Sequence, residues 1–514
     1  MGTRTGIYII AIFMACFCHA AGHGRNTFGD KPVRNKRAGT CTQETNVIST
    51  EDSGKTAHKP ADTGDTKEKK KKAVKRQYIY RFTLKDKSGN PYSLSRPEEF
   101  LSRKSIERRR RQKLPTDSTD MPVSTKYIEM LSVERVKIIG TSRWHNTVLL
   151  STSDTTTVQR LARMNFVRKC EKVYQSPDSI EKEVYDKDYH DCFNPWDTVA
   201  TSRYGVAESQ IAMLNGSALH EASYEGQGVT IAVLDGGFRN ADRIPAFENI
   251  NIIGAKDFIS ENTDDIYRKA DHGTKVLSAM GVNAPYVYTG TAPQAGYWLL
   301  RCEDIQTEQP VEEDYWTMAA EFADSVGADI INSSLGYTQF DRHLGDHRYR
   351  DMDGHTAFIS QSASMLADKG MILITSAGNS GMGPWKKIVF PADAENIITV
   401  GAVTPKGMNA PFCGVGPTQD GRIKPDVMAQ GSPAAVISGR GTINRDMGTS
   451  FSTPVVCGLT ACLWQALPGK TAKEIMDLVR RSADNTDHPD NIFGYGIPDF
   501  GRAYDMGRDG LPQQ

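Results

Sequence analysis

The stretch Met447-Gly448-Thr449-Ser450-Phe451-Ser452-Thr453-Pro454 gives the strongest indication of how this chain folds. It places Ser450 in a Gly-Thr-Ser turn directly before the apolar residues 455–467, which predict a buried helix. A serine at the start of a helix is commonly only a cap. At that position its hydroxyl can also meet an incoming substrate, because the backbone N–H groups there can stabilise a developing negative charge.

Two upstream segments each place a titratable side chain at the end or the start of an apolar run. Residues 228–237 predict a strand that ends on Asp235 and breaks at two glycines. His272 lies in Asp-His-Gly-Thr, before the helical run 276–280. Alone, such an Asp is usually a turn residue and such a His a core or surface group. The order Asp235, His272, Ser450 is one of the known chain orders of the Ser-His-Asp triad.

A fourth segment supplies an amide. Residues 371–380 predict a buried strand that delivers Asn379 at its C-terminal end. Gly-Asn after a strand is an ordinary turn signal. Acyl transfer also needs a donor directed at the oxyanion, and an Asn N–H paired with the nucleophile's own backbone N–H supplies it. The position of Asn379 between the His and Ser segments favours the chemical interpretation.

Together the four motifs resemble those of the subtilisin-like serine peptidases, the subtilases, over roughly residues 204–505. The residues that carry the resemblance are Asp235-Gly236-Gly237, His272-Gly273-Thr274, Ser376-Ala377-Gly378-Asn379 and Gly448-Thr449-Ser450-Phe451-Ser452-Thr453-Pro454. Two positions depart from the family pattern: Gly236 replaces a common Thr or Ser, and Phe451-Ser452-Thr453 replaces a common Met-Ala-Ala or Met-Ala-Thr. Neither departure removes a reacting group.

The resemblance implies a role for each residue. Ser450 would be the nucleophile, His272 the general base and then acid, and Asp235 the carboxylate that orients the imidazole. Asn379 and the Ser450 backbone N–H would bind the oxyanion. The segment Ser334-Leu335-Gly336 resembles the subtilase strand that pairs with an extended substrate, although an ordinary interior strand is the alternative.

The resemblance implies no cofactor for the chemistry, while structural calcium is common in the family. Residues 341–355 are rich in carboxylates and imidazoles, and oxygen-rich loops suit calcium. Their spacing matches no complete calcium loop, so we expect a solvated insertion and assign no metal ligand.

The hydrophobic pattern predicts an α/β fold from residue 204 to residue 507: a doubly wound, mostly parallel sheet with helices on both faces. Apolar runs that predict strands alternate with helical patterns at 315–326 and 475–479. The predicted strands are residues 229–234, 296–300, 329–332, 371–375 and 396–400.

Residues 77–175 predict a small α+β domain that precedes the peptidase region. Strands are expected at 78–84 and 147–150, and helices at 97–112 and 158–164. The place of this domain before a subtilase-like region implies a pro-domain that assists folding and inhibits the enzyme. A permanent accessory domain is the alternative.

The N-terminus resembles an export signal over residues 1–20, with a positive start, an apolar run and small residues for cleavage. Lipid anchoring through Cys16 is the alternative. Residues 21–76 and 176–203 are polar and predict linkers, the first of them disordered. Seven cysteines lie after residue 20. Because this number is odd, at least one of them is expected to be unpaired.

Composition does not indicate a chain-wide electrostatic attraction to nucleic acid or to an anionic membrane, because 62 Lys and Arg balance 62 Asp and Glu. We interpret the basic clusters 67–76 and 107–113 as a solvated helix face or a flexible tether. The sequence thus predicts an exported serine endopeptidase that acts on proteins or peptides. A catalytically silent, subtilase-like binding protein is the alternative. A lipase or esterase would carry Gly-x-Ser-x-Gly, which is not found.

Overall fold

The apolar runs that follow Gly228 build a seven-stranded sheet with the order β13-β12-β11-β10-β5-β9-β6, in which every neighbouring pair is parallel. The core strands are buried along their whole length, as expected when helices cover both faces. The strands are β5 (Thr230–Asp235), β6 (Asn251–Asp257), β9 (Gly296–Arg301), β10 (Ile330–Ser333), β11 (Ile372–Ser376), β12 (Ile398–Val403) and β13 (Val427–Gln430).

The computed structural model describes residues 76–177, 200–260 and 266–508. The predicted export signal (1–20) and Cys16 lie outside these ranges. So do nearly all of the predicted linker 21–76 and most of the linker 176–203. Within the described ranges, no helix is long and apolar enough to cross a bilayer.

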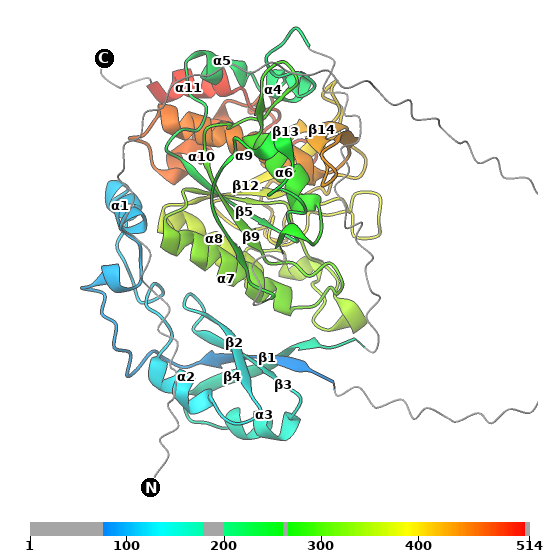
Figure 1. Cartoon of the computed structure of the whole chain (residues 1–514). Coiled ribbons are helices and arrows are strands. Elements are labelled where there is room, and N and C mark those ends of the chain that lie inside the picture. Colours follow the sequence, from blue (N-terminus) through cyan, green and yellow to red (C-terminus); the bar gives the residue numbers. More distant parts are fainter. Residues whose placement is uncertain (1–75, 178–199, 261–265, 509–514) are drawn as a thin grey trace, which may run out of the picture. The chain divides into compact units, whose positions relative to one another are not determined.

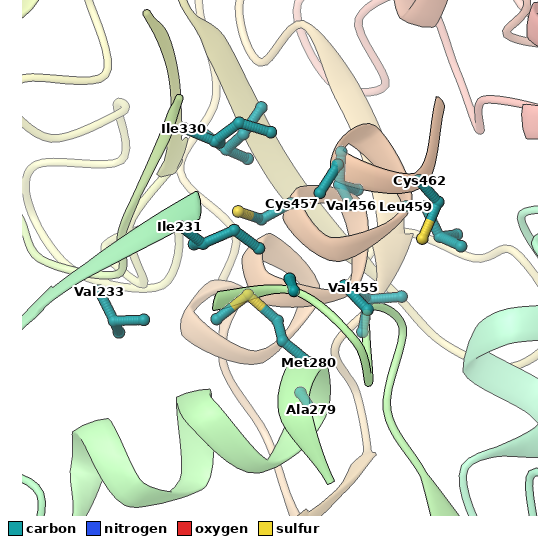
Figure 2. Packing of buried hydrophobic residues seen from close by; sticks show 14 of the residues in the cluster. Ile231, Val233, Ala279, Met280, Ile330, Val455, Val456, Cys457, Leu459 and Cys462 are labelled. Atoms are coloured by element: carbon teal, nitrogen blue, oxygen red, sulfur yellow. The ribbon is translucent and has the colours of Figure 1, made fainter. Parts of the chain in front are cut away.

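Helices cover both faces of the sheet (Figure 1), which confirms the predicted fold class. One apolar core joins the sheet to α6, α9, α10 and α11, and Figure 2 shows Val456 and Cys457 of α9 in this core with Ile231 and Ile330 of the central strands. The opposite core contains residues of α7 and α8. The bounds are α6 (His272–Gly281), α7 (Val311–Val326), α8 (Phe358–Met365), α9 (Thr449–Ala466), α10 (Ala472–Arg481) and α11 (Phe500–Arg508).

Shorter elements complete this region. They are α4 (Glu208–Ala212), α5 (Ser217–Glu221), and the paired strands β7 (Asn283–Ala284) with β8 (Tyr288–Thr289) and β14 (Ala434–Ile437) with β15 (Ile443–Asp446).

The N-terminal region is a four-stranded antiparallel sheet with the order β2-β3-β1-β4. One face packs against α2 and α3 in a core of its own. The other face contributes Ile79, Leu149 and Val173 to the apolar core that contains α7. The elements are β1 (Tyr78–Leu84), α2 (Thr125–Leu131), β2 (Lys137–Ser142), β3 (Thr147–Thr152), α3 (Thr155–Leu161) and β4 (Val167–Gln175).

The segment between β1 and α2 differs from its prediction in two ways. In place of one helix over 97–112, a 3₁₀ turn (Pro97–Glu99) precedes α1 (Arg103–Arg111), because Ser102 caps the second helix by accepting the Ser105 N–H. The prediction that the cluster 107–113 is a solvated face or tether is also wrong for two of its residues.

Arg108 and Arg109 of this cluster are buried, because acidic partners neutralise them. Both guanidinium groups bind Asp324 near the end of α7, and Arg109 Nη1 lies 2.8 Å from Asp324 Oδ1. Arg109 also pairs with the buried Asp120 at 2.8 Å. Charged groups enter a protein interior when they are paired in this way.

Candidate active site

Asp235 and His272 meet at the C-terminal edge of the sheet. Asp235 is the last residue of β5 and is fully buried, and its Oδ1 accepts the N–H of Gly236 at 2.8 Å. His272 is the first residue of α6, with Nδ1 at 3.0 Å and 2.9 Å from the two carboxylate oxygens of Asp235. An N–H on Nδ1 donates to this carboxylate, and Nε2 is then left to accept a proton.

The surroundings of His272 favour its protonated form. Burial lowers the pKa of His272, but the negative charge of Asp235 and the hydrogen bonds to it outweigh burial, and together they raise the pKa to about 9. The charge of Glu303 adds to this increase. A general base needs this property, because the imidazolium that forms during catalysis must be stabilised.

Ser450 is the second residue of α9 and lies close to the segment that follows β10. Its Oγ donates to the Ser334 carbonyl at 3.3 Å, and the Ser334 Oγ donates to the Ser450 carbonyl at 3.0 Å. Among the described residues, no hydrogen bond joins the Ser450 hydroxyl to His272. Catalytic hydrogen bonds are often made only when substrate binds, so the present rotamer is compatible with a later bond to the imidazole.

Asn379 follows β11 and is held through one end of its amide. Its Oδ1 accepts both the N–H and the Oγ1–H of Thr449 at 3.0 Å. The Thr449 Oγ1 in turn accepts the Gly378 N–H at 3.1 Å. Within the described ranges, the hydrogen bonds of the Asn379 side chain are all accepted by Oδ1. Its NH₂ group therefore remains available as a donor. The sequence pattern did not predict that Thr449 holds the Asn379 amide, although its place beside Ser450 was an available signal.

One cavity of about 350 Å³ brings the predicted residues together. Asp235 does not line this cavity but lies buried behind His272. Glu303 lines it without having been predicted. The predicted residues in its wall are His272, Ser334, Leu335, Gly336, Asn379 and Ser450.

The remaining candidate groups show no metal-binding arrangement. Within the described part of the chain, no three His, Cys, Asp or Glu side chains are placed to hold a metal ion. In the acidic segment 341–355, His343 lies 2.6 Å from Asp346, and His347 lies 2.7 Å from Glu313. The described cysteines are free thiols: Cys170, Cys302, Cys413, Cys457 and Cys462.

Comparison with known proteins gives two family matches. The model described as "Subtilase family" matches residues 226–496, more than half of the chain. The model described as "Peptidase S8 propeptide domain, Bacteroidota" matches residues 79–188.

Several curated proteins are similar to this chain. Subtilisin NAT of Bacillus subtilis subsp. natto is 27% identical over 289 residues, which cover 56% of this chain and 68% of that protein. Serine protease AprX of Bacillus subtilis (strain 168) is 29% identical over 301 residues, covering 53% and 65%. Subtilisin of Bacillus pumilus is 26% identical over 276 residues, covering 53% and 90%.

Proposed function

The chain belongs to the subtilase family and is a serine endopeptidase, and from this premise we propose that it cleaves peptide bonds through an acyl-enzyme on Ser450. The observation that carries the proposal is the pairing of His272 Nδ1 with the buried Asp235 at 2.9 Å, beside a cavity that His272 shares with Ser450 and Asn379. Subtilisins need no cofactor for catalysis, and this mechanism uses none.

In the proposed reaction, Ser450 Oγ attacks the substrate carbonyl while its proton passes to His272 Nε2. Asp235 stabilises the imidazolium that forms. The oxyanion accepts hydrogen bonds from the Asn379 NH₂ and the Ser450 backbone N–H. His272 then protonates the leaving amine, and water, activated by His272, hydrolyses the acyl-enzyme.

The segment Ser334-Leu335-Gly336 is our candidate for substrate alignment. Support comes from its place in the cavity wall and from the two hydrogen bonds between Ser334 and Ser450. An extended peptide beside this segment would gain affinity from backbone hydrogen bonds and specificity from side-chain pockets.

We further propose that residues 77–175 act as an inhibitory, folding-assisting pro-domain of an exported zymogen, whose peptidase domain spans 204–507. The match of a propeptide model to residues 79–188 supports the pro-domain. The sequence of residues 1–20 supports export, with lipid anchoring at Cys16 as the competing outcome.

The proposed nucleophile is tested with a serine-reactive fluorophosphonate probe and casein. Ser450→Ala should lose both labelling and hydrolysis, with a loss of turnover near the roughly 10⁶-fold seen when the nucleophile of subtilisin is removed. Ser452→Ala is the matched control, because its hydroxyl donates to the Thr449 carbonyl within α9. Undiminished labelling of Ser450→Ala would place the nucleophile elsewhere. An unlabelled wild type would favour the silent binding protein.

A further inference from the structure

Glu303 is a carboxylate in the wall of the catalytic cavity to which the proposed mechanism gives no role. It lies two residues after β9, is half-buried, and lines the same cavity as His272 and Ser450. In the described ranges, no hydrogen bond or ion pair engages its carboxylate. A charged group in such a place is stabilised only when a partner reaches it.

The main chain beside the triad leaves room for this carboxylate. A Cβ atom on Gly236 would lie 2.9 Å from Glu303 Oε2, which is closer than such atoms approach. Gly236 directly follows Asp235 and is one of the two departures from the usual subtilase motif. The glycine thus allows the Glu303 carboxylate to lie against the backbone that carries the catalytic aspartate.

Among the described residues, no Lys or Arg side chain forms an ion pair with Glu303. Arg301 pairs with Asp257 at 2.7 Å, and Lys275 pairs with Asp446 at 2.8 Å. Burial raises the pKa of Glu303, the negative charge of Asp235 raises it further, and the value reaches about 8. Glu308 and Asp304 act in the same direction, while His272 opposes them. Above this pKa the carboxylate is ionised, and a cation that entered the cavity would pair with it and favour that ionised form.

We propose that Glu303 selects a substrate with a basic side chain, Lys or Arg, within two residues of the scissile bond. The inference rests on the proposed peptidase function, because the substrate chain must then pass through the cavity that Glu303 shares with Ser450. A guanidinium or ammonium group would form a charge-assisted hydrogen bond with the carboxylate. An acidic side chain at the same position would be repelled.

The test uses the wild-type protein after it has cleaved itself, and fluorogenic peptides that differ at one position. Each pair compares arginine with citrulline at one position. Citrulline keeps the shape of the arginine side chain and loses its charge. The positions tested are the two residues on each side of the scissile bond. At about pH 9, where Glu303 is ionised, kcat/KM should fall roughly 10- to 100-fold on exchange at one position, the scale of a hydrogen bond between charged groups. The other positions should change little.

A variant pair assigns the preference to Glu303. In Glu303→Gln the arginine-to-citrulline ratio at the sensitive position should fall to near one. Asp304→Asn removes the neighbouring carboxylate, which does not line the cavity, and should keep the wild-type ratio.

The outcomes separate this inference from the proposed function. A wild type that cuts peptides with no position preferring arginine overturns the inference alone, as does a Glu303→Gln variant that keeps the wild-type ratio. A wild type that cuts neither peptides nor casein and does not react with fluorophosphonate overturns both. If Glu303→Gln fails to fold, the wild-type peptide pairs still test the inference, because the absence of any position that prefers arginine would contradict it.

Discussion

At the scale of single residues, the proposed mechanism makes the pH range of catalysis depend on the hydrogen bonds between His272 and Asp235. His272 accepts a proton only when it is neutral, so kcat/KM should fall as the pH drops below the pKa of His272. An unperturbed histidine would place this limit near 6.5, whereas the Asp235 charge and hydrogen bonds raise it to about 9. We expect a rising pH–rate profile with its limb above pH 7. A limb at or below pH 6.5 would contradict the stated effect of Asp235.

Glu303 titrates in the same range, because burial and Asp235 raise its pKa to about 8. The profile should therefore be measured with a neutral peptide on the wild type and on Glu303→Gln. If the limb belongs to His272, it remains in the variant, shifted slightly downward because the Glu303 charge no longer stabilises the imidazolium.

Asn379, the proposed oxyanion donor, is held in place by Thr449. Asn379→Ala should lower kcat by roughly 10²–10³-fold, the scale seen for one such donor in subtilisin, with a smaller change in KM. Thr449→Val removes one of the two hydrogen bonds to Asn379 Oδ1 and keeps the backbone N–H. We expect an intermediate loss of kcat in Thr449→Val. Steady-state kinetics on one peptide checks both, and a change confined to KM would show that Asn379 positions substrate.

Motif residues of the site could be predicted from sequence, but their supporting residues could not. The motif residues lie at the end or the start of apolar runs, and the sequence alone shows this local pattern. These residues are Asp235, His272, Asn379 and Ser450. Glu303 reaches the cavity only because β9 is the neighbour of β5, although the two strands lie far apart in the chain. Such a juxtaposition depends on strand order, which no local pattern records.

At the scale of elements, the strands that the sequence revealed differ from the missed ones in their place in the large sheet. The five predicted strands of the peptidase region are β5, β9, β10, β11 and β12, which occupy the middle of the sheet. The missed strands, β6 and β13, lie at its two edges. β6 carries exposed Asn251 and a partly exposed Lys256, so it shows no continuous apolar run. β13 is buried and has 4 residues, as many as the predicted β10, so neither its length nor its exposure explains why it was missed.

The contact between α1 and α7 depends on one carboxylate. Asp324 is fully buried and pairs with Arg108, Arg109 and Arg143. Their positive charges hold the pKa of Asp324 well below its usual range, although burial opposes this. Asp324→Asn would leave three buried or nearly buried guanidinium groups without their shared counter-charge. Breaking a buried ion pair in this way costs about 3–5 kcal/mol.

Denaturant unfolding of full-length Ser450→Ala, with and without Asp324→Asn, measures this cost without interference from proteolysis. Glu107→Gln is the control, because its ion pair with Arg110 lies on the surface of α1. Exposed pairs contribute about 0–1 kcal/mol. Equal stability of the Asp324 and Glu107 variants would show that the cluster does not hold α1 in place.

At the scale of the whole molecule, the N-terminal region contacts the peptidase region at two separate places. The sheet of β1 to β4 packs against α7 through one face. The segment around α1 follows the N-terminal edge of the large sheet, where Lys104 binds Thr230 and Asp329, and Gln112 donates to the Gly370 carbonyl at 2.7 Å. Asp235 lies at the other end of β5, so this second contact is remote from the active site.

Two contacts should keep the pro-domain bound after its connection to the enzyme is cut. We expect the wild type to cleave itself within residues 176–203 and Ser450→Ala to stay intact, as followed by gel electrophoresis and mass spectrometry. Fluorophosphonate added after cleavage stops further digestion, and the fragment should then co-elute with the enzyme on size exclusion. Asp324→Asn should release the fragment, because the buried arginines lose their shared partner. An active wild type that remains uncut would instead identify residues 77–175 as a permanent accessory domain.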